Sequence, residues 1–233
     1  MSNRQTYRSI INLIIPVGEQ LSLKAEKSGL TLREEVSYDI LKRIKGNLEV
    51  LSILPFEEIS AVSIKLILRS IFSDLISGLY LLSCGDEELN IALFRLDYEH
   101  FLSMKEWAKC HDNLISSQNL VQQLNTTYKD FIVKSKLKKL SISSMASELN
   151  KLNGSISELS NLYSEYRLLS QTEHYSHKGA RFSYIQIYDE QLINTIYIPI
   201  IDYSIKHFIN LIPDQFRIRP TDTPHTPEGM SEQ

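Results

Sequence analysis

The side chains best suited to chemistry lie in one stretch, between residues 163 and 177. They follow each other at alternating steps of four and three residues: Tyr163, Arg167, Ser170, His174 and His177. In a helix these five positions fall within roughly a quarter of the circumference, because an α-helix turns about 100° per residue. This face is therefore the candidate site.

Arg167 and His174 supply the two functions that RNA cleavage requires. A guanidinium holds a phosphate by a forked pair of charge-assisted hydrogen bonds, and an imidazole moves a proton near neutral pH. The ribose 2′-hydroxyl would attack the adjacent phosphorus, with His174 taking or returning the proton and Arg167 stabilising charge on the phosphoryl oxygens. We predict Arg167 and His174 as catalytic residues, supported by Tyr163, Ser170 and His177.

A structural role for the same residues is the alternative. Arg69 and Asp74 lie on a narrow polar strip of an otherwise apolar helix expected at residues 56–83, and we count both as supporting residues. Arg167 could instead pair with a buried acid such as Asp74 or Glu99. Buried polar groups need partners, so such a network would use the same residue types without catalysis.

We expect no metal and no cofactor. His174 and His177 could form one edge of a metal site, but no pair of Glu-x-x-His sequences on two helices supplies further ligands. The chain also lacks a glycine loop that would cradle phosphates and a nucleophile elbow.

A basic run before residue 140 is the candidate nucleic-acid contact. Its lysines could bind the RNA backbone, next to aromatic side chains available for stacking. The alternative is a solvated charged face. The predicted contacts are Lys134, Lys136, Lys138 and Lys139.

Long helices are the expected elements, because strand-like alternation is nearly absent and only eight glycines and seven prolines interrupt the chain. We predict one or two short helices in residues 5–28, broken near Pro16 and Gly18. Further helices are expected at 31–54, 56–83, 86–109, 141–150, 155–178 and 183–211. The helices at 56–83 and 86–109 should form an antiparallel hairpin. The helix at 183–211 should be kinked or split at Pro199.

The predicted fold is an all-α bundle of long antiparallel helices. It divides into an N-terminal helical segment at 1–55, a core helical bundle at 56–212 and a flexible tail at 213–233, disordered or irregular, which has too little apolar surface to offset the entropy of ordering.

The composition allows one large folded domain, with 233 residues of which 42% are hydrophobic. A formal charge of −3 argues against a general polyanion-binding protein. Cys84 and Cys110 lie outside any Cys-x-x-Cys spacing, as in a cytosolic protein with reduced thiols. Without an export signal or an uninterrupted apolar run of about 20 residues, we expect a cytoplasmic protein with no membrane contact.

The stretch from Tyr166 to Ser170, followed by His174 and Ser176, resembles the Tyr-Arg-x-x-Ser-x-x-x-His-x-Ser signature of the bacterial family called domain of unknown function 5677. Further similarity lies at residues 68–73 and 141–146, and the resemblance spans roughly residues 60–205.

The chain is also similar, more weakly, to the HEPN superfamily. These are helical bundles, often dimeric, in which an arginine and a histidine four to six residues further on form a metal-independent ribonuclease site. Arg167 and His174 have six residues between them, while Leu168 and His177 depart from the usual pattern.

These resemblances imply an HEPN-like endoribonuclease acting as a toxin or anti-phage effector, with RNA, a second copy of the chain or an antitoxin as partners. The competing hypothesis is a non-catalytic helical module that binds a protein or a nucleic acid. Exposure distinguishes the two, because an active site requires Arg167 and His174 to line a reachable cleft.

Overall fold

A computed structural model describes residues 3–55, 60–110, 119, 122, 126, 140–152, 157–170 and 193–216. The regular elements of this part of the chain are all helical, which confirms the all-α prediction. They are α1 (Asn3–Ser28), α2 (Leu32–Ile53), α3 (Ala61–Ser83), α4 (Asp86–Cys110), α6 (Ile142–Leu152), α7 (Ser157–Ser170), the π-helical turn η2 (Ile193–Tyr197), α10 (Ile198–Leu211) and the 3₁₀ turn η3 (Asp214–Phe216).

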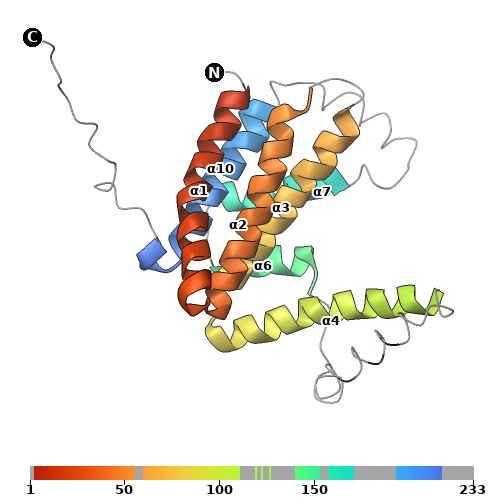
Figure 1. The fold of residues 1–233 in the computed structure, drawn as a ribbon. Helices are drawn as coiled ribbons and strands as arrows, with labels where there is room; N and C mark the ends of the chain where they lie inside the picture. The colour runs from red at the N-terminus through yellow and green to blue at the C-terminus, as the bar shows by residue number, and fades with distance from the viewer. Residues whose placement is uncertain are drawn as a thin grey trace, which may run out of the picture.

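Helix α3 is the centre of the molecule. Helices α1, α2, α3 and α10 pack in a ring, each against the next, while α6 and α7 pack on another side of α3 (Figure 1). Helix α3 can serve both groups because its apolar side chains cover most of its circumference: Leu68, Ile71, Phe72, Leu75 and Leu79 are fully buried.

By length and composition, Val62–Ser83 also resembles a membrane span, with a mean hydropathy of 1.5. It is the one such helix among the described residues, and 56% of its most apolar window is buried inside the protein. The core helix of a bundle has these properties too, so they are weak evidence for a membrane.

Gly78 lets three helices approach closely. A Cβ atom at this position would lie 2.6 Å from Phe208 Cε2 on α10 and 2.9 Å from Ile40 Cδ1 on α2. Both distances are shorter than van der Waals contact, so the absence of a side chain on α3 determines how near α2 and α10 come.

The prediction of a break in the N-terminal helix was wrong. Helix α1 runs unbroken through Pro16 and Gly18. An interior proline costs about 3 kcal/mol. Against this, α1 buries an apolar stripe on α2 and α10, and each fully buried side chain contributes about 1.5–3 kcal/mol; the stripe comprises Tyr7, Ile10, Ile14, Val17 and Leu21.

The start of α2 agrees with its predicted capping box. The backbone N–H of Glu34 donates to Thr31 Oγ1, and the Glu34 carboxylate accepts from the Thr31 backbone N–H at 2.8 Å. The same carboxylate accepts from Lys24 Nζ at 2.7 and 2.8 Å and from Gln215 Nε2 at 3.0 Å. Glu34 therefore joins α1, α2 and η3.

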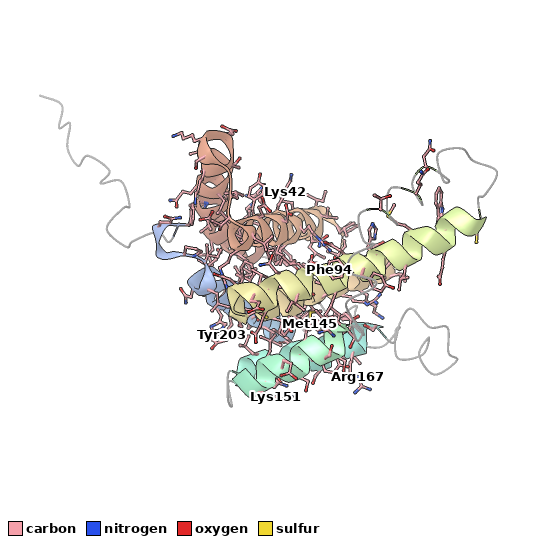
Figure 2. All side chains as sticks on the ribbon, turned by 90° about the horizontal axis from the view of Figure 1, so that it is seen from below. Lys42, Phe94, Met145, Lys151, Arg167 and Tyr203 are labelled. Carbon is pink, nitrogen blue, oxygen red and sulfur yellow. The ribbon has the colours of Figure 1, made fainter. Side chains whose placement is uncertain are left out.

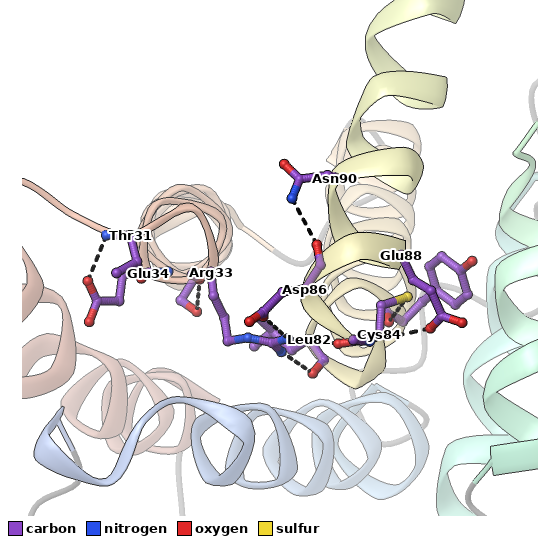
Figure 3. A network of polar contacts seen from close by, with 11 residues as sticks. Thr31, Arg33, Glu34, Leu82, Cys84, Asp86, Glu88 and Asn90 are labelled. Carbon is purple, nitrogen blue, oxygen red and sulfur yellow. Dashed lines mark hydrogen bonds and ion pairs between the residues drawn. The ribbon is translucent and has the colours of Figure 1, made fainter. Parts of the chain in front are cut away.

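Arg33, next to Glu34, ties α2 to the end of α3. Its guanidinium donates to the carbonyl oxygens of Leu82 at 2.6 Å and Cys84 at 2.7 Å, and pairs with Asp86 at 3.0 Å (Figure 3). Carbonyls in the last turn of a helix have no partner within the helix, so the guanidinium acts as a cap for α3.

The predicted antiparallel hairpin of α3 and α4 is wrong. Figure 1 shows α4 crossing the end of the bundle and projecting past it, instead of running back along α3. Leu89 and Ala92 near its start are buried, whereas Leu102 and Trp107 near its end are 39% and 51% exposed. The apolar pattern predicted the helix but not its packing angle.

The C-terminal helix changes from π-helical to α-helical geometry just before Pro199, near the position where a kink or a split was predicted. Helix α10 begins at Ile198 with Pro199 in its first turn, where the missing N–H needs no partner, and η2 precedes it. The predicted flexible tail begins with an ordered turn, since Phe216 is only 5% exposed. The rest of that tail lies outside the described residues.

One apolar cluster includes buried side chains from the predicted N-terminal segment and from the predicted core bundle. Leu41, Ile44 and Leu48 of α2 belong to it together with Leu68 and Phe208. Helices α1 and α2 therefore share their core with the helices that follow.

Candidate functional site

Helix α7 carries Tyr163, Arg167 and Ser170 of the candidate face, of which Arg167 is exposed and the other two are partly buried. Leu159, Leu162 and Leu169 anchor it in the core, each at most 6% exposed, and Arg167 lies on the exposed side. Figure 2 shows Arg167 at the outer surface of α7. The Ser170 hydroxyl donates to the Tyr166 carbonyl at 2.7 Å, so it serves its own helix and does not cross the bundle.

Two arginine–tyrosine pairs form along this face. The rings of Tyr163 and Tyr166 stack with their centroids 6.2 Å apart. Arg167 Cζ lies 6.0 Å from the centre of the Tyr163 ring, and Arg69 Cζ of α3 lies 5.6 Å from that of Tyr166. The fold thus brings Arg69 to the predicted face, with each guanidinium in cation–π range of a ring.

Asp74 pairs with an arginine that the sequence analysis did not propose. Its Oδ1 lies 2.8 Å from the Arg43 guanidinium of α2, and its side chain is 6% exposed. The suggested pairing of Arg167 with Asp74 is therefore not found. The side chain of Glu99, the other acid considered, lies outside the described residues.

The Asp74 carboxyl is poorly stabilised in its charged form. Burial raises its pKa to about 6, and the Arg43 charge only partly opposes this effect. Its Oδ2 atom is buried and accepts no hydrogen bond from any group in the part of the chain that the structure describes. A titratable side chain shifted in this way next to a cavity is a candidate for function.

Asp74 lines a groove of about 830 Å³ between α2, α3, α4, α6 and α7. Tyr163 of the predicted face and Tyr166, which was not predicted as part of it, also line the groove, whereas Arg167 and Arg69 are not among its lining residues. The polar lining consists of carboxylates, one guanidinium and hydroxyls: Asp39, Arg43, Ser73, Asp74, Ser77, Asp97, Ser141, Ser143, Tyr163 and Tyr166.

Several predicted site residues lie outside the described residues. These are His174 and His177, together with Lys134, Lys136, Lys138 and Lys139. The structure describes α7 only to Ser170, so it does not place His174 relative to Arg167. Within the described ranges, no three His, Cys, Asp or Glu side chains are placed to hold a metal ion together.

The sequence analysis missed Arg43, Asp39 and Asp97. Asp39 and Arg43 are four residues apart on α2, a spacing that also suits a solvated ion pair on a helix surface. The available signal was the polar strip on α3. Ser70 and Asp74 both find partners on α2, at Asn47 and Arg43.

Comparisons with models of protein families, with curated proteins and with solved structures find no match for this chain. The likenesses described above therefore depend on the residues that carry them.

Proposed function

We propose that this chain is a metal-independent endoribonuclease with an HEPN-like arrangement of antiparallel helices, in which Arg167 binds the scissile phosphate and His174 transfers the proton. The observation that carries this proposal is the exposure of Arg167. An arginine held in a structural network would be buried against an acid, whereas this guanidinium is exposed and lies next to the Tyr163 ring.

The tyrosine–arginine face suits single-stranded RNA. Bases stack on aromatic rings and on guanidinium planes, and phosphates pair with arginine. Arg69 and Arg167 supply positive charge there, in contrast to the three carboxylates that line the neighbouring groove. Phosphates would therefore approach α7 from its outer side.

The chemistry follows from the two side chains. The 2′-oxygen attacks phosphorus as its proton leaves to a base, the bond to the 5′-oxygen breaks, and that oxygen receives a proton. The products are a 2′,3′-cyclic phosphate and a 5′-hydroxyl, and Arg167 stabilises the charge that develops on the phosphoryl oxygens. The proposed reaction uses no metal or other cofactor.

The biological role proposed is that of a toxin or anti-phage effector in the cytoplasm. A homodimer would place two α7 faces near one another, and a protein antitoxin would cover them. Both partners are proposed from the HEPN likeness.

The test is cleavage of a panel of labelled RNAs by the full chain in the presence of EDTA. Arg167→Ala and His174→Ala should each lower the rate about 100-fold or more, and the double variant should be little worse, because residues that act as a unit are not additive. Arg8→Ala on α1 and His100→Ala on α4 are the matched controls, since both side chains are exposed elsewhere. Equal cleavage by all variants, a requirement for Mg²⁺, or products with a 3′-hydroxyl would reject the proposal.

A non-catalytic interaction module is the second candidate, favoured by the exposed apolar side chains of α4. Ile91 is 47% exposed and Leu102 is 39% exposed, and their separation of eleven residues places them within about 20° of each other around the helix. No cleavage of any RNA in the panel by the wild-type chain would favour this candidate.

A further inference from the structure

The groove between α2, α3, α4, α6 and α7 has the size of a small-molecule site. Its volume of about 830 Å³ lies within the range of about 300–1,000 Å³ typical of ligand pockets. Its walls are largely apolar, with Leu81, Leu96 and Met145 among them. Carboxylates, hydroxyls and one guanidinium lie among these apolar side chains, and such polar groups can orient a ligand.

Asp74 lines this groove with one carboxylate oxygen that accepts no hydrogen bond from the described residues. Its side chain is only 6% exposed, yet just one carboxylate oxygen, Oδ1, is engaged, by Arg43 at 2.8 Å. The other oxygen, Oδ2, is buried and receives no hydrogen bond from the described residues. Native proteins rarely leave a buried acceptor unsatisfied, so Oδ2 is suited to accept a hydrogen bond from a molecule bound in the groove.

The charge of the groove favours a positively charged ligand. Among the described residues, three carboxylates line it, from Asp39, Asp74 and Asp97, together with one guanidinium, that of Arg43. An anion would meet a net negative wall, whereas a cation would relieve the repulsion among these acids. A metal ion fits less well, because no three potential ligands converge among the described residues.

We propose that this groove binds a compound with a basic nitrogen on an apolar stem, the nitrogen donating to Asp74 Oδ2 while Arg43 keeps Oδ1. An alkylammonium has three donors, and the hydroxyls of Ser73 and Ser77, which line the groove on either side of Asp74 along α3, offer further acceptors. The stem lies along the apolar walls. This binding site goes beyond the proposed nuclease activity and does not depend on it.

A free amine and the basic side chain of a peptide share this chemistry. The experiment is isothermal titration calorimetry on the full chain at pH 7.5, with 1,5-diaminopentane, spermidine and an end-blocked lysine tripeptide as probes. Binding of the amines alone identifies a small molecule, and tighter binding of the tripeptide identifies a peptide. Either result supports the site, provided that 1-pentanol, the neutral comparison, binds at least 10-fold more weakly.

Asp74→Asn should weaken the amine at least 10-fold, because the amide keeps the shape and removes the charge. Asp86→Asn is the matched control, since this carboxylate is 91% exposed and does not line the groove. The Asp86→Asn variant should bind the amine with the same affinity as the wild type. The shift of the Asp74 carboxyl ¹³C signal on titration of the wild-type protein should report contact at this residue without any substitution.

Three results would overturn the inference: no binding by any of the amines, equal binding of 1-pentanol, or equal affinity in a folded Asp74→Asn variant. Binding of Mg²⁺ or Ca²⁺ that competes with the amines and moves the Asp74 signal would replace it with a metal site. None of these measurements uses RNA, so their failure and the failure of the nuclease proposal are distinguishable.

Discussion

Glu34 and Asp74 are both buried carboxylates, with 3% and 6% of their side chains exposed, but their surroundings differ. Glu34 accepts hydrogen bonds from Lys24, Gln215 and the Thr31 backbone, so both of its oxygens are engaged. Asp74 has one ion pair, to Arg43, and one buried oxygen without a hydrogen bond from the described residues. The first arrangement holds three elements together, whereas the second leaves bonding capacity for a ligand.

The two pKa values move in opposite directions for this reason. Burial alone would raise the pKa of Glu34, but the hydrogen bonds from Lys24 and Thr31 outweigh it, and the pKa falls below its ordinary value of 4.5. At Asp74 burial dominates, and the pKa rises from 3.8 to about 6. A satisfied buried acid therefore stabilises the fold at neutral pH, and an unsatisfied one destabilises it.

The larger of two expected effects on stability is that of Glu34→Gln. This substitution removes the charge that Lys24 and the Thr31 backbone stabilise, and hydrogen bonds to charged groups contribute about 1.5–3 kcal/mol. We expect the free energy of unfolding at pH 7 to fall by about 2 kcal/mol, measured by urea denaturation. Because the folded pKa is lowered, the loss should shrink as the pH falls below about 4. An unchanged midpoint would contradict the structural role of this carboxylate.

The smaller effect, opposite in sign, is that of Asp74→Asn. A shift from 3.8 to about 6 corresponds to about 3 kcal/mol against the folded state at pH 8, and the buried amide retains part of this penalty. We expect the variant to be about 1 kcal/mol more stable than the wild type at pH 8. The free energy of unfolding of the wild type should rise relative to that of the variant as the pH falls from about 7 to about 4, because the folded state binds the Asp74 proton at a higher pH than the unfolded state does.

The control for this prediction is Glu26→Gln on α1, an exposed acid outside the groove, which should leave the pH dependence unchanged. The titratable and charged groups that line the groove together with Asp74 are Arg43 and Asp39 of α2, Asp97 of α4 and the two tyrosines of α7. A wild-type protein that loses stability relative to Asp74→Asn between pH 7 and pH 4 would contradict the account.

The sequence predicts local features of this fold well and relations between helices poorly. The capping box of Thr31 and Glu34 and the apolar stripes of α2 and α3 depend on neighbours within one or two turns, and the structure contains them. The path of α4 was not predictable, because its angle depends on which surfaces remain uncovered after α2, α3 and α6 have packed. Helix α1 differed from prediction because burial outweighed a local breaker, Pro16.

The candidate site divides in the same way. Helical periodicity in the sequence predicts two polar groups of residues. One is the strip that contains Arg69 and Asp74, and the other is the face that contains Tyr163 and Arg167. The pairing of Asp74 with Arg43 could not be predicted, because it depends on the register between α2 and α3. The groove of about 830 Å³ likewise arises only where five helices meet.

The most direct test is a carboxyl ¹³C NMR titration that follows Glu34 and Asp74 in the same folded wild-type sample. Asp74 should titrate near pH 6, and Glu34 should titrate below 4.5. If instead Asp74 titrated at or below pH 4, its second oxygen would be fully satisfied, and the contrast between a structural acid and a ligand-binding acid would fail.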